Sequence, residues 1–358
     1  MTAGVLSVES GRQPGAASLP PVITTTHPEN GNTSVHTFVR ELGQDVAAEV
    51  NHATPIAGEA DARLVGVPGE PRAERLYRRM RFIRRFEQSL LDLFERGLLN
   101  GTTHACIGQE ADAVAVIEHL GDDDHVFSNH RCHGHFLART GDALGLMAEI
   151  MGKPEGVCGG IGGSQHLCAP GFMSNGVQGG IVPNAAGIAL AKQLDGSTGL
   201  SVVFIGDGTL GEGATYETLN LASLWRLPLV VVLEDNEWAQ STPSSANLAG
   251  SIRDRFTAFG LGVFEIDSTD VEELDAVAER ALAQARTREG PVAIVIHTYR
   301  LCHHSKNDDN RPADEVAARW ELDPIEVHGR RLGVSARAAI DTEVESALQD
   351  VIDRALAL

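Results

Sequence analysis

Asp207 and Asn236 each stand just after a run of apolar residues. We expect the two runs to be adjacent parallel strands, so both side chains would lie at the carboxyl edge of one sheet. A carboxylate and a carboxamide at such an edge suit a hard cation that keeps phosphate oxygens among its other ligands. Gly206 and Gly208 flank the aspartate, and without side chains they would let the backbone approach a diphosphate closely.

Alternating strands and helices must position these two residues. Helical spacing of apolar residues between Leu76 and Phe94, with arginines on the other face, predicts a first helix. The alternation that follows predicts an α/β fold, with a mostly parallel sheet flanked by helices on both faces. Strands are predicted at residues 201–205, 229–233, 262–266 and 292–297, and helices at 110–119, 143–151, 185–194, up to 225, 272–288 and 335–357, the last as one or two helices.

The chain divides into two parts of different composition. Residues 1–68 are rich in Gly, Pro, Ser, Thr and Ala, and we expect a largely irregular N-terminal extension with one possible helix at residues 37–50. An arm that wraps a partner subunit is the alternative. Residues 69–358 are expected to form the folded domain. Within it, residues 156–183 are glycine-rich without regular periodicity, and so long a loop is usually functional.

The composition narrows the possible partners and the compartment. The chain has 358 residues, with 29 Lys+Arg and 49 Asp+Glu, so its formal net charge is −20. This charge argues against non-specific binding to nucleic acid and against binding to an anionic membrane surface. Five cysteines without a CxxC pair favour a reducing compartment. Because neither a signal peptide nor a long apolar stretch is visible, we expect a cytoplasmic location.

Several ordered motifs resemble the alpha subunits of thiamine-diphosphate-dependent 2-oxo-acid dehydrogenases, a family that acts on pyruvate, branched-chain 2-oxo acids or acetoin. A GDG motif alone has little specificity, but GDG followed one strand later by Asn236 is similar to the family's cofactor motif. The resemblance runs from about Leu76 to Pro324. Further matching blocks are HACIGQE at 104–110, HRCHG at 130–134, GGSQH at 162–166, NGVQGGIVPNAAGIA at 175–189, LWRLP at 224–228 and TYR at 298–300.

The resemblance implies a set of ligands for thiamine diphosphate and Mg²⁺. Asp207 and Asn236 would bind Mg²⁺ through their side chains, and Trp238 would bind it through its backbone carbonyl, with diphosphate oxygens completing the shell. Gly208 and Thr209 would open the next helix with their amides facing the diphosphate. The resemblance therefore implies that the GDG turn binds both the metal ion and the diphosphate.

Four further residues are expected to contact the cofactor. Arg131 would pair with the diphosphate, because a guanidinium suits bidentate phosphate contacts. His130 stands where many relatives have tyrosine and acetoin-type members have histidine, and a solvent-facing loop histidine is the alternative. Gly176 and Gln178 would contact the aminopyrimidine through backbone groups.

Histidines are expected to line the substrate pocket. His104 and His304 match pocket positions of the family, and a histidine there can orient substrate or handle protons at neutral pH. His303 replaces a glycine that relatives usually carry and adds a possible hydrogen-bond donor at the pocket mouth. This departure weakens the assignment of pyruvate and would suit a hydroxylated or phosphorylated donor. His133 is expected to be either supporting or structural.

The resemblance also implies what a single chain lacks. In the family, the cofactor attacks a carbonyl carbon, an enamine is left on its ring, and an acyl unit passes to a lipoyl carrier. The glutamate that activates the pyrimidine lies on a separate beta subunit. We therefore expect this chain to be inactive alone and to work as two alpha and two beta chains, with active sites at their interfaces.

Three functions remain open at this point. The first is the alpha subunit of a two-component 2-oxo-acid or acetoin dehydrogenase that acts with a lipoyl carrier. The second is a transketolase-like half-enzyme that transfers a two-carbon ketol unit from a ketose phosphate to a lipoyl or carrier-protein acceptor. The third is a non-catalytic, cofactor-binding scaffold subunit, which the presence of Asp207, Asn236 and Arg131 disfavours.

Overall fold

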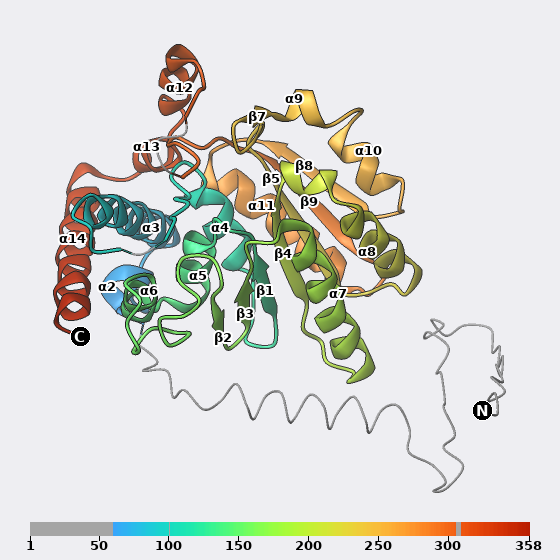
Figure 1. Ribbon diagram of the computed structural model, residues 1–358, viewed down its shortest axis with the longest axis horizontal. Coiled ribbons are helices and arrows are strands. Elements are labelled where there is room, and N and C mark those ends of the chain that lie inside the picture. The colour runs from blue at the N-terminus through green and yellow to red at the C-terminus, as the bar shows by residue number, and fades with distance from the viewer. Residues whose placement is uncertain (1–59, 100, 306–308) are drawn as a thin grey trace, which may run out of the picture. The chain divides into compact units, whose positions relative to one another are not determined.

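The apolar runs before Asp207 and Asn236 form neighbouring strands of a seven-stranded sheet (Figure 1). The computed structural model describes residues 60–99, 101–305 and 309–358. The strand order is β2-β3-β1-β4-β5-β9-β8, in which β2 runs antiparallel to β3 and the other neighbours are parallel. The strands are β1 (His125–Ser128), β2 (Cys168–Ala169), β3 (Phe172–Ser174), β4 (Ser201–Gly206), β5 (Leu229–Asp235), β8 (Gly262–Asp267) and β9 (Val292–His297).

Strand β4 shows why helices must pack on both faces of this sheet. Val202 and Phe204 pack into one apolar core, whereas Val203 and Ile205 pack into a second core on the other side. Successive side chains of a strand point to opposite faces, so a strand without polar alternation is buried on both. The predicted α/β fold class is confirmed. The first core takes in α3 (Arg72–Glu95), α4 (Glu110–Ile117), α5 (His133–Thr140), α6 (Ala143–Ile150), α11 (Val271–Arg286) and α14 (Val334–Ala357), and the second takes in α7 (Gln178–Leu194), α8 (Gly213–Leu224) and α10 (Ile252–Thr257).

Short elements complete the described chain. They are α2 (Ala62–Val65), the hairpin strands β6 (Trp238–Ala239) and β7 (Thr242–Pro243), α9 (Ser244–Asn247), α12 (Ala313–Trp320) and α13 (Pro324–Gly329).

No helix among the residues that the structure describes is long and apolar enough to cross a bilayer.

Helix α2 lies in the region that the composition predicts to be irregular. The Asp61 side chain accepts a hydrogen bond from the Arg63 N–H and so caps the helix. Leu64 is fully buried and joins the core that α3 and α14 share. The described part of residues 1–68 thus contains one short helix in a stretch predicted to be largely irregular. The helix predicted at residues 37–50 lies outside the described residues, and the division after residue 68 stays a prediction.

The glycine-rich stretch is more regular than its composition suggests. It contains β2, β3 and the first turns of α7, which begins at Gln178 and passes through Pro183. Strands of two and three residues are too short to show a period in the sequence. A 3₁₀ turn (Asp207–Gly211) also separates β4 from α8, so Gly208 and Thr209 do not open the α-helix as expected.

The order in which strands join the sheet determines where a ligand can bind. From β1 the chain crosses to β3 on one side, and β4 then pairs with β1 on the other side. The chain therefore leaves β1 toward one edge of the sheet and leaves β4 toward the opposite edge. The crevice outside the carboxyl ends of two such strands is the usual ligand site of α/β sheets. Residues 129–131 follow β1 and Asp207 follows β4, so both segments reach this crevice.

A buried ion-pair cluster joins three of the helices. Arg84 of α3 donates hydrogen bonds to Glu110 at the start of α4 and, at 2.9 Å, to Asp323 at the start of α13. All three side chains are buried, and burial raises the pKa of Glu110 although Arg84 opposes the rise. Glu110 is therefore part of the framework and does not line a substrate cavity.

A second polar cross-link stands at the carboxyl ends of β5, β8 and β9. His297 Nδ1 lies 3.0 Å from Asp235 Oδ2, and His297 Nε2 lies 3.0 Å from Glu265 Oε1. The hydrogen bond to Asp235, supported by Glu265 and opposed by partial burial, raises the pKa of His297 to about 9. The imidazole is therefore charged at neutral pH and ties three strands together next to Asn236.

We expect His297→Gln to lower stability at neutral pH and to matter less at high pH. The folded-state pKa is raised above the ordinary 6.5, so the ion pairs stabilise the fold fully below about pH 6.5. This stabilisation is lost as the pH rises through about 9. Thermal unfolding followed by circular dichroism should show midpoints that differ by a few degrees near pH 7 and converge above about pH 9. A difference that does not change with pH would contradict the assignment.

Candidate active site

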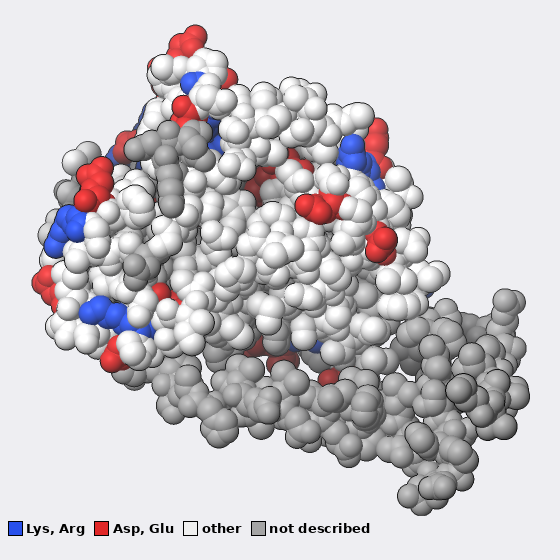
Figure 2. Space-filling model, viewed as in Figure 1, with Lys and Arg blue, Asp and Glu red and all other residues white. Residues whose placement is uncertain are grey.

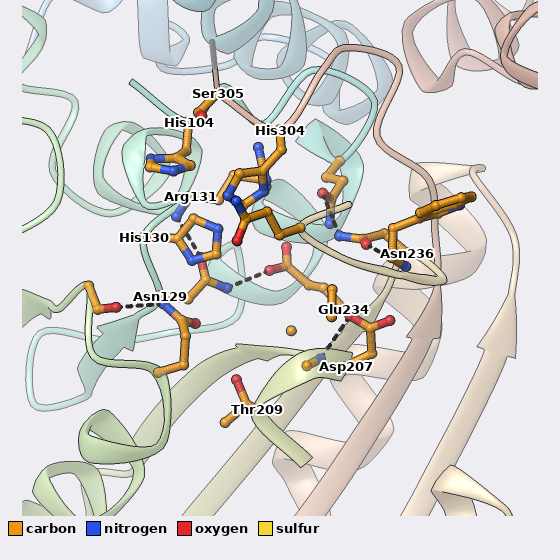
Figure 3. Close-up of a pocket in the computed structure, with 18 of the residues that line it drawn as sticks. His104, Asn129, His130, Arg131, Asp207, Thr209, Glu234, Asn236, His304 and Ser305 are labelled. Carbon is orange, nitrogen blue, oxygen red and sulfur yellow. Dashed lines mark hydrogen bonds between the residues drawn. The ribbon is translucent and has the colours of Figure 1, made fainter. Parts of the chain in front are cut away.

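The crevice outside β1, β4 and β5 opens into a cavity of about 540 Å³ (Figure 3). All of the predicted site residues except His303 line it, and His303 stands next to a lining residue in the chain. The roles of these residues stay predictions, but the structure brings them together. The lining residues are His104, Gln109, Asn129, His130, Arg131, Gln165, Gly176, Gln178, Gly206, Asp207, Gly208, Thr209, Glu212, Glu234, Asn236, Trp238, Ala239, Gln240, His304 and Ser305.

Asp207 stands at the end of β4 with its side chain almost withdrawn from water. Its Oδ1 accepts a hydrogen bond from the Gly208 N–H at 2.9 Å, and its Oδ2 accepts one from the Ser244 hydroxyl. Burial raises the pKa of Asp207 to about 6, a rise that Ser244 opposes and Asp235 increases. Both hydrogen-bond partners are neutral, so a bound cation would stabilise the buried negative charge.

Asn236 and Trp238 lie just beyond the end of β5. Asn236 Oδ1 accepts a hydrogen bond from the Trp238 N–H at 3.2 Å, and Asn236 Nδ2 donates to Gln109 Oε1 at 3.4 Å. Because β4 and β5 pair in parallel, Asn236 and Asp207 emerge at the same edge of the sheet, as their sequence positions predict.

Three imidazoles form one wall of the cavity (Figure 3). The ring centroids of His104, His130 and His304 lie 4.7 to 5.3 Å apart, and one ring nitrogen of each lies within 4.8 Å of the others. Three ring nitrogens at this spacing could coordinate a transition-metal ion. However, Arg131 Nη2 lies 3.3 Å from His304 Nδ1, and a permanent positive charge there opposes a second cation.

The same guanidinium determines how two of these rings are protonated. Arg131 has only donors, so His304 Nδ1 accepts its hydrogen bond and the neutral ring carries its proton on Nε2. Burial, followed by the charge of Arg131 and the two neighbouring imidazoles, holds the pKa of His130 well below its usual range. His130 is therefore uncharged at neutral pH and offers hydrogen bonds rather than charge.

A buried hydrogen-bonded chain holds the segment after β1. The Arg131 N–H donates to Asn129 Oδ1 at 2.7 Å, and Arg131 Nη1 donates to the Ala105 carbonyl oxygen at 2.6 Å. Asn129 Nδ2 in turn donates to Glu234 Oε2 at 3.1 Å, and Glu234 Oε1 lies 3.2 Å from His135 Nε2. These contacts connect the end of β1 with the end of β5 and fix Arg131 at the cavity.

Three buried polar atoms of the lining have no partner among the described residues: Gln109 Nε2, His130 Nε2 and Thr209 Oγ1. Buried polar groups in proteins are almost always paired, so atoms of this kind that line a cavity are available to a bound ligand. Gly206 also faces open space, because a Cβ there would meet no atom within 4 Å. Open backbone, polar hydrogens and a buried carboxylate together fit a diphosphate bridged by a metal ion.

Eight lining residues are absent from the sequence-based prediction: Gln109, Asn129, Gln165, Glu212, Glu234, Ala239, Gln240 and Ser305. Four of them, Gln109, Asn129, Gln165 and Glu234, hold other lining residues by hydrogen bonds. Each stands inside or directly beside a matching motif block or a strand end, which is the signal that could have identified it. Their contacts join segments far apart in the chain, and no periodicity reveals such contacts.

The loop that carries His104 approaches the chain after β9 so closely that position 108 requires glycine. Gly108 has a φ of +99°, and a Cβ there would lie 2.4 Å from the Tyr299 carbonyl oxygen. One residue earlier, the Ile107 carbonyl oxygen accepts a hydrogen bond from the Leu301 N–H at 2.9 Å. The loops that present His104 and His304 are therefore held against each other.

Gly108→Ala should lower the free energy of unfolding by about 2 kcal/mol, because it adds a steric clash to an unfavourable φ. Gly97→Ala is the matched control, since Gly97 has a φ of +72° and a Cβ there meets no atom within 4 Å. The control should lose only about 1 kcal/mol. Equilibrium urea unfolding measures both, and equal losses would show that the close approach does not constrain the loop.

One known protein family matches most of this chain. The family described as dehydrogenase E1 component matches residues 78–356, a range that includes every residue of the cavity lining. The match therefore covers the whole candidate site.

Individual relatives agree with the family match. The alpha subunit of acetoin:2,6-dichlorophenolindophenol oxidoreductase from Bacillus subtilis is 37% identical over 294 residues, which covers 80% of this chain and 88% of the relative. The subunit of the same name from Cupriavidus necator is 36% identical over 287 residues, covering 79% and 85%. The pyruvate dehydrogenase E1 component subunit alpha of Rhizobium meliloti is 35% identical over 285 residues, covering 77% and 82%. These matches confirm the alpha-subunit part of the first functional interpretation, whereas its lipoyl carrier stays a prediction: the chain belongs to the dehydrogenase E1 component family, as an alpha-type subunit of the thiamine-diphosphate-dependent 2-oxo-acid dehydrogenases.

Proposed function

We propose that this subunit binds thiamine diphosphate together with Mg²⁺ in the cavity at the ends of β1, β4 and β5. The proposal depends most on one observation, a buried carboxylate that shares a cavity with buried polar atoms lacking partners. A diphosphate would supply oxygens both to a hard cation and to those polar hydrogens. When bound, the cofactor supplies a carbon nucleophile and an electron sink for cleavage beside a carbonyl group.

Magnesium would lie between the strand ends and the diphosphate. Asp207 and Asn236 would bind it through side-chain oxygens, and Trp238 through its backbone carbonyl. A carboxylate has about four lone-pair sites, so Asp207 can accept the hydrogen bonds from Gly208 and Ser244 and still coordinate a cation. The support for magnesium is this set of oxygen donors at one sheet edge.

Arg131, His130 and the turn after Asp207 would hold the diphosphate. A guanidinium has five N–H donors, and the bonds from Arg131 to Ala105 and His304 use two of them. The remaining donors suit phosphate oxygens. The Thr209 hydroxyl and His130 Nε2 are further candidates, because both atoms are buried without a partner. Gly206 and Gly208 would let the backbone approach the diphosphate, and Gly176 and Gln178 would contact the aminopyrimidine.

The donor would be a small 2-oxo acid or a hydroxyketone such as acetoin. The names of two relatives contain acetoin, and the names of six contain pyruvate dehydrogenase. His104 and His304 would orient the donor or move protons, and the neutral His130 beside them favours hydrogen bonds to hydroxyl or carbonyl groups. His303, which does not line the cavity, would act only at its mouth. The acyl unit would then pass to a lipoyl carrier.

A second, beta-type chain would complete the site. Figure 2 shows a face of the molecule whose middle, over α7, carries few charged side chains, although the whole chain has a net charge of −20. Large apolar side chains are exposed near the cavity and on α8, with Val177 at 66%, Leu224 at 67% and Ile161 at 91% exposure. Exposed apolar groups of this size mark surfaces that partners cover. We propose that a beta subunit covers them in an assembly of two alpha and two beta chains.

Asp207→Ala should weaken the Mg²⁺-dependent binding of thiamine diphosphate by at least about a hundredfold, because it removes a charged ligand of the metal. Isothermal titration calorimetry on the full chain, with Mg²⁺ present and absent, measures the loss. Asp195→Ala is the control, because Asp195 is an exposed aspartate at the end of α7. If Asp207→Ala still bound thiamine diphosphate tightly, the assignment of Asp207 as a metal ligand would be wrong.

A donor screen on this chain reconstituted with its beta subunit would identify the substrate. We expect carbon dioxide release from pyruvate or oxidation of acetoin, with 2,6-dichlorophenolindophenol as an artificial electron acceptor. Neither chain should turn over alone, because the site would be divided between them. Aldose phosphate released from a ketose phosphate would instead favour ketol transfer. Turnover by this chain alone would refute the divided site.

A further inference from the structure

Three buried side chains outside the cavity lining form a linear hydrogen-bonded chain. Glu87 Oε2, from α3, lies 3.1 Å from His133 Nδ1, and His133 Nε2 lies 2.8 Å from Ser164 Oγ. Glu87 and His133 are fully buried, and Ser164 is 6% exposed. The family assignment leaves this cluster without a role.

The order carboxylate, imidazole, hydroxyl is the same as in the catalytic triad of serine hydrolases. A nucleophilic serine needs a substrate within reach. Ser164 lines neither the 540 Å³ cavity nor the two further cavities of about 340 and 390 Å³. The burial of Ser164 favours a role as a hydrogen-bond partner over attack on a substrate.

Two members of the chain are attached to different segments of the site. Glu87 Oε1 accepts a hydrogen bond from the Cys106 N–H at 2.9 Å, and this segment also carries His104. His133 is the first residue of α5 and follows Arg131 by two positions. One carboxylate therefore holds both the His104 segment and the Arg131 segment.

The third member attaches a further segment. Ser164 directly precedes Gln165, whose Nε2 lies 3.3 Å from His104 Nδ1. The Ser164 carbonyl oxygen also accepts a hydrogen bond from Cys132 Sγ at 3.2 Å. Three segments far apart in the chain thus meet at one buried cluster, and each carries a residue that lines the cavity.

The negative charge of Glu87 strengthens the hydrogen bonds of this cluster. Burial opposes ionisation, but His133 and the Cys106 N–H outweigh it and hold the pKa of Glu87 below its usual range. Glu87 is therefore ionised at neutral pH, and hydrogen bonds to an ionised acceptor are the strong ones. Because an ionised carboxylate only accepts hydrogen bonds, His133 donates from Nδ1 to Glu87, and its Nε2 faces the Ser164 hydroxyl.

We propose that Glu87, His133 and Ser164 are positioning residues that hold the His104, Arg131 and Gln165 segments in register with one another. The inference builds on the proposed function, in which Arg131 contacts the diphosphate and His104 contacts the donor. Removal of the Ser164 hydroxyl would weaken the attachment of the Gln165 segment to the other two, leaving it the bonds to Cys132 and His104. Cofactor and donor would then meet side chains that are held less firmly in place.

The test compares Ser164→Ala with Ser201→Ala. Ser201 is fully buried at the amino end of β4, and its hydroxyl donates to the Ala185 carbonyl oxygen at 2.7 Å. Both variants lose one buried hydrogen bond and should lose similar thermal stability. In the full chain without cofactor, only Ser164→Ala should speed amide hydrogen exchange at residues 104–109, 129–133 and 162–166, by about tenfold. In the assembled enzyme, only Ser164→Ala should raise KM for the donor, also by about tenfold.

Ser164→Thr keeps the hydroxyl and should restore both exchange protection and KM. Glu87→Gln provides a second variant, because it keeps an acceptor for Cys106 but removes the charge, and it should loosen the same residues. Equal exchange in Ser164→Ala and Ser201→Ala would overturn the proposal, as would labelling of Ser164 by a fluorophosphonate. The exchange experiment needs no cofactor, so its outcome is independent of whether Asp207→Ala loses thiamine diphosphate binding.

Discussion

The active site depends on the burial of β1, β4 and β5 on both faces of a parallel sheet. Inside such strands a polar side chain would lack partners on either face, so the chemistry of this chain is confined to the points where strands end. Asn129, Asp207 and Asn236 follow β1, β4 and β5. Because the three strands run in one direction, these residues meet at one edge. The reversal of connections between β1 and β4 then leaves a crevice there.

Buried polar bonds hold the segments around this crevice, together with a small apolar cluster of Ala105, Ile107, Tyr299 and Leu301. Asn129 and Glu234 join the ends of β1 and β5, and Glu87 joins the segments after α3 and β1. Hydrogen bonds are directional, so they determine the orientation of a side chain more narrowly than apolar contacts do. Each bond also makes the site sensitive to substitution, since the loss of one partner leaves a buried polar group without a hydrogen bond and lowers stability. The precision of the site and its sensitivity to substitution therefore have the same origin.

The parts of the fold that the sequence predicted are those with long apolar patterns. Strands β4, β5 and β9 and helices α11 and α14 lie where their patterns place them, within a few residues. Strand β1 has four residues, and α5 buries His133 and His135 on an inward face, so neither shows a clear apolar period. The short strands β2 and β3 were hidden in a glycine-rich stretch for the same reason.

The site was predictable only in part. Asp207 and Asn236 could be placed from strand ends alone, whereas the histidines of the cavity wall required a resemblance to relatives. Glu234 could not be identified, because its role arises from contacts with residues distant in the chain. The glycine expected to carry diphosphate contacts at the start of a helix, Gly208, lies in a 3₁₀ turn, since the chain leaves β4 with a tight turn before α8 begins.

The Arg84 cluster has a consequence for how this sequence can change over generations. One guanidinium holds two buried carboxylates, Glu110 and Asp323, which lie far apart in the chain. A mutation of Arg84 alone would leave two buried negative charges without their cation, at a cost of several kcal/mol. We therefore expect a substitution at one of these three positions to be costly unless the other two change with it. Their inheritance as a set would preserve the contact between α3, α4 and α13 even where the surrounding sequence diverges.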